Sequence, residues 1–249
     1  MITLKYLFTA VISLILWSLS LTTFVILGVI FITLSFLIHP RFLWRLAKYT
    51  CQISLAMLGQ RLVVSGRFPS LDEGPYIYIF NHTSLIDTFI LFAVLPEFTG
   101  AIGKAEQFKI PLWGWLLKRW GAIPIQRAQL HQAIESINQA SNAVSQGLSL
   151  LISPEGTRSS DGALQAFKKG PFYIAMHNQT PLVPIIIKGA YASKNKHSWI
   201  VRPGRIDINI AAPLTPEVIS YESIESLHEQ AHQAFQNLLD EHLAIPKTL

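Results

Sequence analysis

The N-terminal part of the chain is one long apolar stretch. No charged side chain occurs from Tyr6 to Ile38. A helix of about 33 residues is roughly 50 Å long, whereas the hydrocarbon core of a bilayer is about 30 Å thick. Two full crossings would need about 40 residues. The stretch therefore predicts a retained membrane anchor, either one tilted helix or a short hairpin that bends at the polar residues Ser18, Ser20, Thr22 and Thr23.

The pattern changes along the rest of the chain. From Arg41 to Gly59 apolar residues recur at helical spacing, which predicts an amphipathic helix near lipid headgroups or an ordinary packing helix. After Gln60, short apolar runs alternate with helical stretches. The expected strands are Leu62–Val64, Tyr76–Phe80, Thr99–Ile102, Ala122–Ile125, Ser149–Ile152, Val183–Ile187 and Ile206–Ile210. The expected helices cover residues 84–94, 111–119, 129–146, 169–178 and 222–243.

These strands are apolar along most of their length. Such strands are typical of parallel sheets whose two faces are both covered by helices. We therefore predict an α/β fold with a mostly parallel central sheet flanked by helices, preceded by an N-terminal hydrophobic helical membrane anchor. The predicted division is membrane-anchoring helices at residues 1–60 and an α/β domain at residues 61–249.

The composition indicates a protein that contacts a membrane or buries an unusually large core. Hydrophobic residues make up 50% of the chain and charged residues 14%, with a net charge of +5. The basic residues are dispersed, so an anionic lipid surface explains the charge better than nucleic acid does. Arg41, Arg45 and Lys48 follow the apolar stretch and Lys5 precedes it, which places the C-terminal domain on the cytoplasmic side. The single cysteine, Cys51, excludes an intrachain disulfide.

The strongest local motif is N-H-T-S-L-I-D at residues 81–87, between an expected strand and an expected helix. On a regular helix His82 and Asp87 would be about 140° apart. We therefore predict that His82 precedes the helix, with Ser84 as the N-cap and Asp87 as the third helical residue. Asp87 could then fix the imidazole tautomer and leave the other ring nitrogen free as a base. The alternative is that Asp87 only caps the helix while His82 packs elsewhere.

A second motif, S-P-E-G-T-R-S at residues 153–159, also follows an expected strand. Gly156 permits a tight turn, and Glu155 could accept a hydrogen bond from a hydroxyl group. Arg158 could hold a phosphate through two parallel hydrogen bonds. The alternative is a solvated turn with a local pair between Glu155 and Arg158.

A third motif, G-A-I-P-I-Q-R at residues 121–127, ends in Arg127, and Lys104 follows another expected strand. Together with Arg158, these cations at three strand ends predict a site for a dianion, although any one of them could be a surface charge.

Together, N-H-T-S-L-I-D, G-A-I-P-I-Q-R, P-E-G-T-R-S and V-P-I-I-I resemble the four ordered blocks of the glycerophospholipid acyltransferases, most closely the 1-acyl-glycerol-3-phosphate acyltransferase branch. The resemblance implies that His82 is the general base and Asp87 its orienting partner. It implies acceptor-binding roles for Lys104, Arg127, Glu155, Gly156, Thr157 and Arg158. The N-terminal segment is similar to the two-helix membrane motif of such enzymes. Ser153 and Gln126 depart from the pattern, in which many members have an aromatic residue and an aspartate, so the acceptor stays open.

The resemblance implies transfer of a fatty acyl group from acyl-CoA or acyl carrier protein to 1-acyl-glycerol-3-phosphate, giving phosphatidic acid. His82 would take the hydroxyl proton and later protonate the leaving thiolate. We expect no cofactor and no metal. The expected partners are membrane lipids, a lysophospholipid acceptor and the acyl donor, and the expected location is the cytoplasmic side of a bacterial inner membrane.

Three alternatives remain. The acceptor could be a lyso-ornithine lipid or another lysophospholipid. The protein could be a non-catalytic lipid-binding protein, although the presence of both His82 and Asp87 argues against this. It could be a serine hydrolase, although no G-x-S-x-G sequence occurs in the chain.

Overall fold

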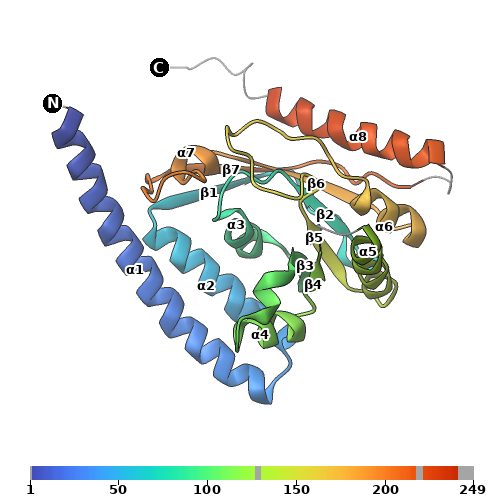
Figure 1. Cartoon of the computed structure of the whole chain (residues 1–249), viewed down its shortest axis with the longest axis horizontal. Coiled ribbons are helices and arrows are strands. Elements are labelled where there is room, and N and C mark those ends of the chain that lie inside the picture. Colours follow the sequence, from blue (N-terminus) through green and yellow to red (C-terminus); the bar gives the residue numbers. More distant parts are fainter. Residues whose placement is uncertain (1, 127–129, 217–220, 241–249) are drawn as a thin grey trace.

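The computed structural model describes residues 2–126, 130–216 and 221–240 (Figure 1). The strands are β1 (Gln60–Ser65), β2 (Ile77–Phe80), β3 (Thr99–Lys104), β4 (Ile123–Ile125), β5 (Ser149–Ile152), β6 (Leu182–Lys188) and β7 (Gly204–Ile210). The α-helices are α1 (Ile2–Leu37), α2 (Trp44–Met57), α3 (Asp87–Val94), α4 (Trp113–Arg119), α5 (Leu130–Ser145), α6 (Gly170–Asn178), α7 (Ala190–Ser193) and α8 (Tyr221–Asp240).

The strands form one sheet in the order β1-β7-β6-β2-β5-β3-β4. Neighbouring strands are parallel except β6 and β7, which pair antiparallel. Each expected strand is present, with ends shifted by at most two residues. The predicted α/β class with a mostly parallel sheet is therefore confirmed.

Helices cover both faces of the sheet (Figure 1). The short strand β2 shows why its sequence is apolar throughout. Ile77 and Ile79 belong to the core that includes buried residues of α6 and α8, whereas Tyr78 and Phe80 belong to the core on the side of α2 and α3. Because side chains alternate between the faces of a strand, a sheet buried on both faces needs apolar residues at every position.

The N-terminal helix α1 is uninterrupted, which agrees with the alternative of a single helix and not with a hairpin that bends at residues 18–23. The Ser18 hydroxyl donates to the Leu14 carbonyl within the helix, at 2.8 Å, and so needs no break in the backbone. The chain reverses instead at residues 38–43, and α2 returns along α1 (Figure 1). The Ser20 hydroxyl joins the two helices by donating to the Ser54 carbonyl at 2.9 Å.

The outer surface of α1 carries many exposed large apolar side chains, among them Leu7, Phe8, Val25 and Phe36. Within the described residues, α1 is the one helix that is long and apolar enough to cross a membrane. Exposed apolar patches of this extent mark contact with lipid or with another protein. The surface therefore supports the predicted membrane association.

The amphipathic helix predicted after the anchor is α2. It packs against α1 and α3, and its residues Cys51 and Leu55 are buried. The Lys48 ammonium donates to the carbonyl groups of Val94 and Leu95, at 3.3 and 2.8 Å, where α3 ends. A cation at the C-terminal end of a helix is favourable because the carbonyl groups there lack helical partners. Lys48 thus holds α3 in place.

Candidate active site

The first and second motifs meet because the strands before them are neighbours. β2 and β5 are parallel, with Ile79 opposite Ile152, so their carboxyl ends lie at the same edge of the sheet. The loops that follow are joined directly: the backbone N–H of Ser159 donates to the His82 carbonyl at 2.7 Å. Ligands of open α/β sheets bind at this kind of edge.

His82 and Asp87 are in contact. The Nδ1 atom of His82 lies 2.9 Å from Oδ2 of Asp87, and the same oxygen accepts the backbone N–H groups of Thr83 and Ser84, each at 2.7 Å. The Asp87 side chain is fully buried, whereas the His82 side chain is 23% exposed. A buried carboxylate that accepts three hydrogen bonds is held firmly in one orientation.

The local helix geometry differs from the prediction. Helix α3 begins at Asp87 with Ile86 as its N-cap, so Ser84 is not the N-cap and Asp87 is not the third helical residue. The reason is that the Asp87 carboxylate itself satisfies the N–H groups of the turn that precedes the helix. The outcome for the pair is the predicted one, because His82 lies before the helix and Asp87 reaches back to it.

This contact assigns the tautomer. Because a carboxylate accepts hydrogen bonds, the neutral imidazole of His82 carries its proton on Nδ1 and keeps the lone pair on Nε2. The Phe80 ring packs against the imidazole in a T-shaped arrangement, with 5.5 Å between ring centroids. The imidazole is therefore held on one side by a carboxylate and on another by an aromatic ring, with a basic nitrogen still available.

The Ser84 hydroxyl is fully buried and donates to the Lys194 carbonyl at 2.5 Å. A serine nucleophile needs its hydroxyl hydrogen-bonded to a base. The Ser84 contact therefore argues against the hydrolase alternative.

Glu155 joins the loop that carries His82 to the loop that contains Glu155 and Gln165. It is only 3% exposed, and its oxygens accept the backbone N–H groups of His82 at 2.7 Å and Gln165 at 3.0 Å. Burial raises the pKa of Glu155 to about 7, and the two hydrogen bonds only partly oppose this effect. Because both oxygens have backbone donors, Glu155 positions the backbone of His82. Its predicted contact with an acceptor hydroxyl stays a prediction.

Gly156 turns the second loop with a φ of +70°, which only glycine adopts without strain. Beyond it, Thr157 is exposed and Arg158 is half-buried. In the part of the chain that the structure describes, neither Glu155 nor any other carboxylate forms an ion pair with Arg158. The alternative of a local pair between Glu155 and Arg158 is therefore not observed.

The residues that the structure describes do not place the other two predicted cations, Lys104 and Arg127, at the loops of His82 and Arg158. Lys104 ends β3, two strands away from β2, and its exposed ammonium lies 3.6 Å from the Glu106 carboxylate. Arg127 lies outside the described residues. The dianion site formed from all three cations therefore stays a prediction.

The site offers no set of metal ligands. Within residues 2–126, 130–216 and 221–240, no three His, Cys, Asp or Glu side chains come together as metal ligands would.

The motifs did not predict a role at the site for two further residues, Asn81 and Lys194. Asn81 ties the end of β2 to β6, because its amide accepts the N–H of Ile187 at 2.7 Å and donates to the Ile187 carbonyl at 3.0 Å. Its place beside His82 was an available signal. Lys194 touches Ser84 from a segment 110 residues further along the chain, and no motif marks it.

Comparison with known proteins agrees with this geometry. The family model described as Acyltransferase matches residues 61–188. The 1-acyl-sn-glycerol-3-phosphate acyltransferase of Cocos nucifera is 34% identical over 193 residues, which cover 77% of this chain and 62% of the relative. The enzyme of that name from Saccharomyces cerevisiae is 27% identical over 201 residues, covering 80% of this chain and 66% of the relative. The chain thus spans less than two thirds of either relative.

A solved structure shows the same fold. The crystal structure of the 1-acyl-sn-glycerophosphate (LPA) acyltransferase PlsC from Thermotoga maritima matches with a TM-score of 0.83 and 23% sequence identity. The match covers 98% of this chain and 100% of that chain. The family match extends over more than half of the chain and includes the motifs that position His82, Asp87 and Arg158. The chain therefore belongs to the acyltransferase family, as its motifs predicted.

Proposed function

We propose that this protein transfers a fatty acyl group from acyl-CoA or acyl carrier protein to the free hydroxyl of 1-acyl-glycerol-3-phosphate, giving phosphatidic acid. The observation that carries the proposal is the hydrogen bond of 2.9 Å between His82 and the buried Asp87, at the carboxyl edge of the sheet. The names of the coconut and yeast relatives and of the Thermotoga maritima enzyme support the choice of acceptor.

The chemistry follows from the tautomer of His82. Nε2 removes the proton of the acceptor hydroxyl while its oxygen attacks the thioester carbonyl carbon. The imidazolium that forms is stabilised by the Asp87 carboxylate. When the tetrahedral intermediate collapses, the carbon–sulfur bond breaks and His82 returns the proton to the leaving thiolate. The ester is thus made without net gain or loss of protons by the enzyme.

The oxyanion of the intermediate needs hydrogen-bond donors. The backbone N–H groups of Thr83 and Ser84 already donate to Asp87, and that of Ile86 faces the Ser84 hydroxyl at 3.4 Å. The donors therefore come from elsewhere on the rim or from the bound substrates.

The acceptor is held through its phosphate. Arg158 lies next to Ser159, whose N–H donates to the His82 carbonyl, so Arg158 belongs to the loop that contacts the backbone of His82. A guanidinium binds phosphate bidentately, and positioning of this kind lowers the barrier by several kcal/mol. Lys104, Arg127, Gly156 and Thr157 complete the proposed acceptor-binding set.

The membrane delivers the lipid substrates. The apolar surface of α1 adjoins the domain that carries the site, and the dominant basic residues follow α1 at Arg41 and Arg45. By the positive-inside rule these residues support our proposal that the site lies on the cytoplasmic side of a bacterial inner membrane.

The proposal is tested by acyl transfer. Membranes that contain the protein are incubated with acyl-CoA or acyl carrier protein as donor and with a panel of lysolipids, and the products are separated and identified. We expect phosphatidic acid from 1-acyl-glycerol-3-phosphate with at least one donor. Transfer to a lyso-ornithine lipid or another lysophospholipid, without transfer to 1-acyl-glycerol-3-phosphate, would contradict the proposed acceptor.

A further inference from the structure

Lys194 is a buried cation at the candidate site. It follows the short helix α7, and its carbonyl accepts the hydroxyl proton of Ser84, two residues from His82. The residue is only 8% exposed. The contact brings the loop after α7 to the edge of the sheet where the His82 and Arg158 loops meet.

In the part of the chain that the structure describes, Lys194 has no negatively charged partner. Its ammonium has three N–H donors, and one of them bonds to the Asn195 carbonyl at 2.7 Å. Among the described residues no carboxylate forms an ion pair with Lys194 or with Arg158. Burial lowers the pKa of Lys194, and the nearby Arg158 guanidinium lowers it further.

A buried ammonium with a second cation nearby and no anionic partner is unfavourable, and an anion bound to both cations relieves this cost. A phosphate monoester carries close to two negative charges and several acceptor oxygens at neutral pH. It therefore satisfies both cations at once.

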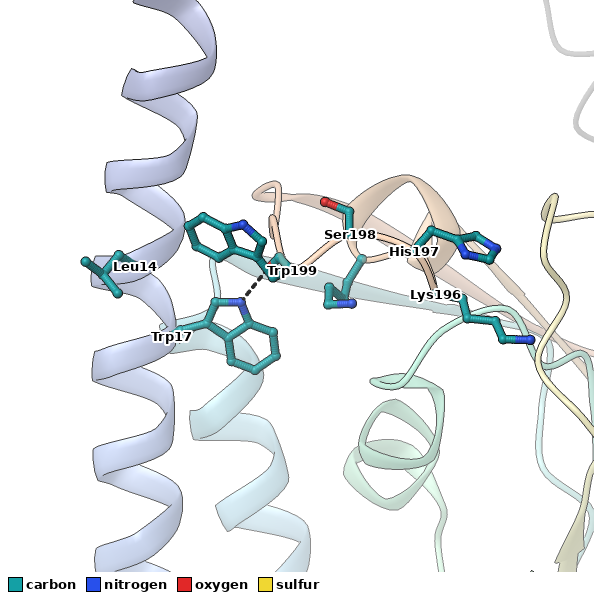
Figure 2. Close-up of a pocket in the computed structure, with 7 residues that line it drawn as sticks. Leu14, Trp17, Lys196, His197, Ser198 and Trp199 are labelled. Carbon is teal, nitrogen blue, oxygen red and sulfur yellow. Dashed lines mark hydrogen bonds between the residues drawn. The ribbon is translucent and has the colours of Figure 1, made fainter.

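Lys194 also lines an open pocket of about 530 Å³ beside α1 (Figure 2). Leu14 and Trp17 of α1, with Trp199, supply an apolar side, whereas Lys196 and His197 extend away from α1 (Figure 2). A pocket that is apolar toward the membrane helix and cationic toward the loop suits an amphiphile with a chain and a phosphate.

We propose that Lys194 is a second phosphate-binding residue, which acts with Arg158 to hold the phosphate monoester of the acceptor beside His82. The inference rests on the proposed function and adds to it a residue that none of the family motifs contains. It predicts preference for acceptors with a terminal phosphate monoester over phosphodiester lysolipids, whose single negative charge leaves one cation unpaired.

The test is the replacement of Lys194 by glutamine, which removes the charge and leaves a polar side chain that is one atom shorter. We expect the KM for 1-acyl-glycerol-3-phosphate to rise roughly tenfold or more, because a hydrogen bond to a charged group is lost. The kcat at saturating acceptor and the KM for the acyl donor should change little. Lys194→Arg should restore much of the acceptor affinity. The matched control is Arg202→Gln, which removes an exposed cation eight residues further along.

The outcomes separate the two proposals. If the unaltered protein transfers no acyl group to 1-acyl-glycerol-3-phosphate, the proposed function fails. If it does transfer and Lys194→Gln leaves the acceptor KM unchanged, the role of Lys194 fails. A rise in the KM of acyl-CoA alone would assign Lys194 to the donor's phosphates and would also overturn the inference. A fall in kcat alone, with a lower melting temperature and no rescue by arginine, would assign it a structural role and overturn the inference too.

Discussion

Replacing Asp87 by asparagine isolates the charge of the carboxylate, because asparagine has almost the same shape. The Asp87 oxygen lies 2.9 Å from Nδ1 of His82, and opposite unit charges at this distance attract by about 6 kcal/mol at an effective dielectric constant of about 20. If the imidazole carries roughly half a charge in the transition state, the lost stabilisation is about 3 kcal/mol. This corresponds to a fall in kcat of roughly 100-fold.

The assay is acyl transfer at saturating concentrations of both substrates. The exposed Asp72, which lies in a turn outside the site, provides the matched control Asp72→Asn, and this variant should keep full activity. The acceptor KM of Asp87→Asn should change much less than its kcat, because Asp87 is buried and touches no substrate. A folded Asp87→Asn protein with a kcat within threefold of the unaltered enzyme would refute the reasoning.

Three further predictions concern the loops around the site. Gly156→Ala places a side chain at a φ of +70°, which should destabilise the fold by about 1–2 kcal/mol and lower the melting temperature by on the order of 3–6 °C. The control Gly204→Ala adds its side chain in open space and should change the melting temperature little. Equal melting temperatures of the two variants would contradict the strain at Gly156. Burial raises the pKa of Glu155 from 4.5 to about 7, so its ionisation destabilises the folded state as the pH rises through that range. The free energy of unfolding, measured relative to that of Glu155→Gln, should therefore decrease from pH 4.5 to 7 and then level off. An increase over this range would contradict the raised pKa. Trp17→Phe removes the hydrogen bond of 2.9 Å from the Trp17 indole to the Trp199 carbonyl. The loop that contains Lys194 should then be held less firmly, and the acceptor KM should rise about fivefold at constant kcat. An unchanged acceptor KM would show that α1 does not position this loop.

Much of the fold could be predicted because a sheet buried on both faces leaves a clear mark in the sequence. Strands such as Ile77–Phe80 and Leu182–Lys188 are almost entirely apolar. An amphipathic helix would instead show polar residues at helical spacing within such a segment. The contact between His82 and Asp87 could also be predicted, because a motif between a strand and a helix leaves few ways for the two side chains to meet.

The start of α3 could not be predicted from capping preferences. Ser84 is a favoured N-cap residue, yet its hydroxyl bonds to the distant Lys194 carbonyl, while the Asp87 carboxylate satisfies the N–H groups of the turn. The choice between a single helix and a hairpin in the anchor stayed open for a related reason, because the sequence does not show that the Ser18 hydroxyl bonds within its own helix. In both cases the sequence does not reveal the partners of the polar side chains.

Lys194 shows the same limit for the site. Its sequence neighbours contain two further cationic or titratable residues, Lys196 and His197, and nothing local distinguishes one of the three. Only the tertiary contact between its carbonyl and the Ser84 hydroxyl reveals that the Lys194 segment adjoins the candidate site.

The most direct test of the central claim is the replacement of His82 by alanine in the full chain, followed by acyl transfer to 1-acyl-glycerol-3-phosphate and by sedimentation with phospholipid vesicles. The account predicts that transfer is abolished while vesicle binding is unchanged, because His82 supplies the base and the apolar surface of α1 supplies the membrane contact. A His82→Ala protein that binds vesicles and retains full transfer activity would contradict the account.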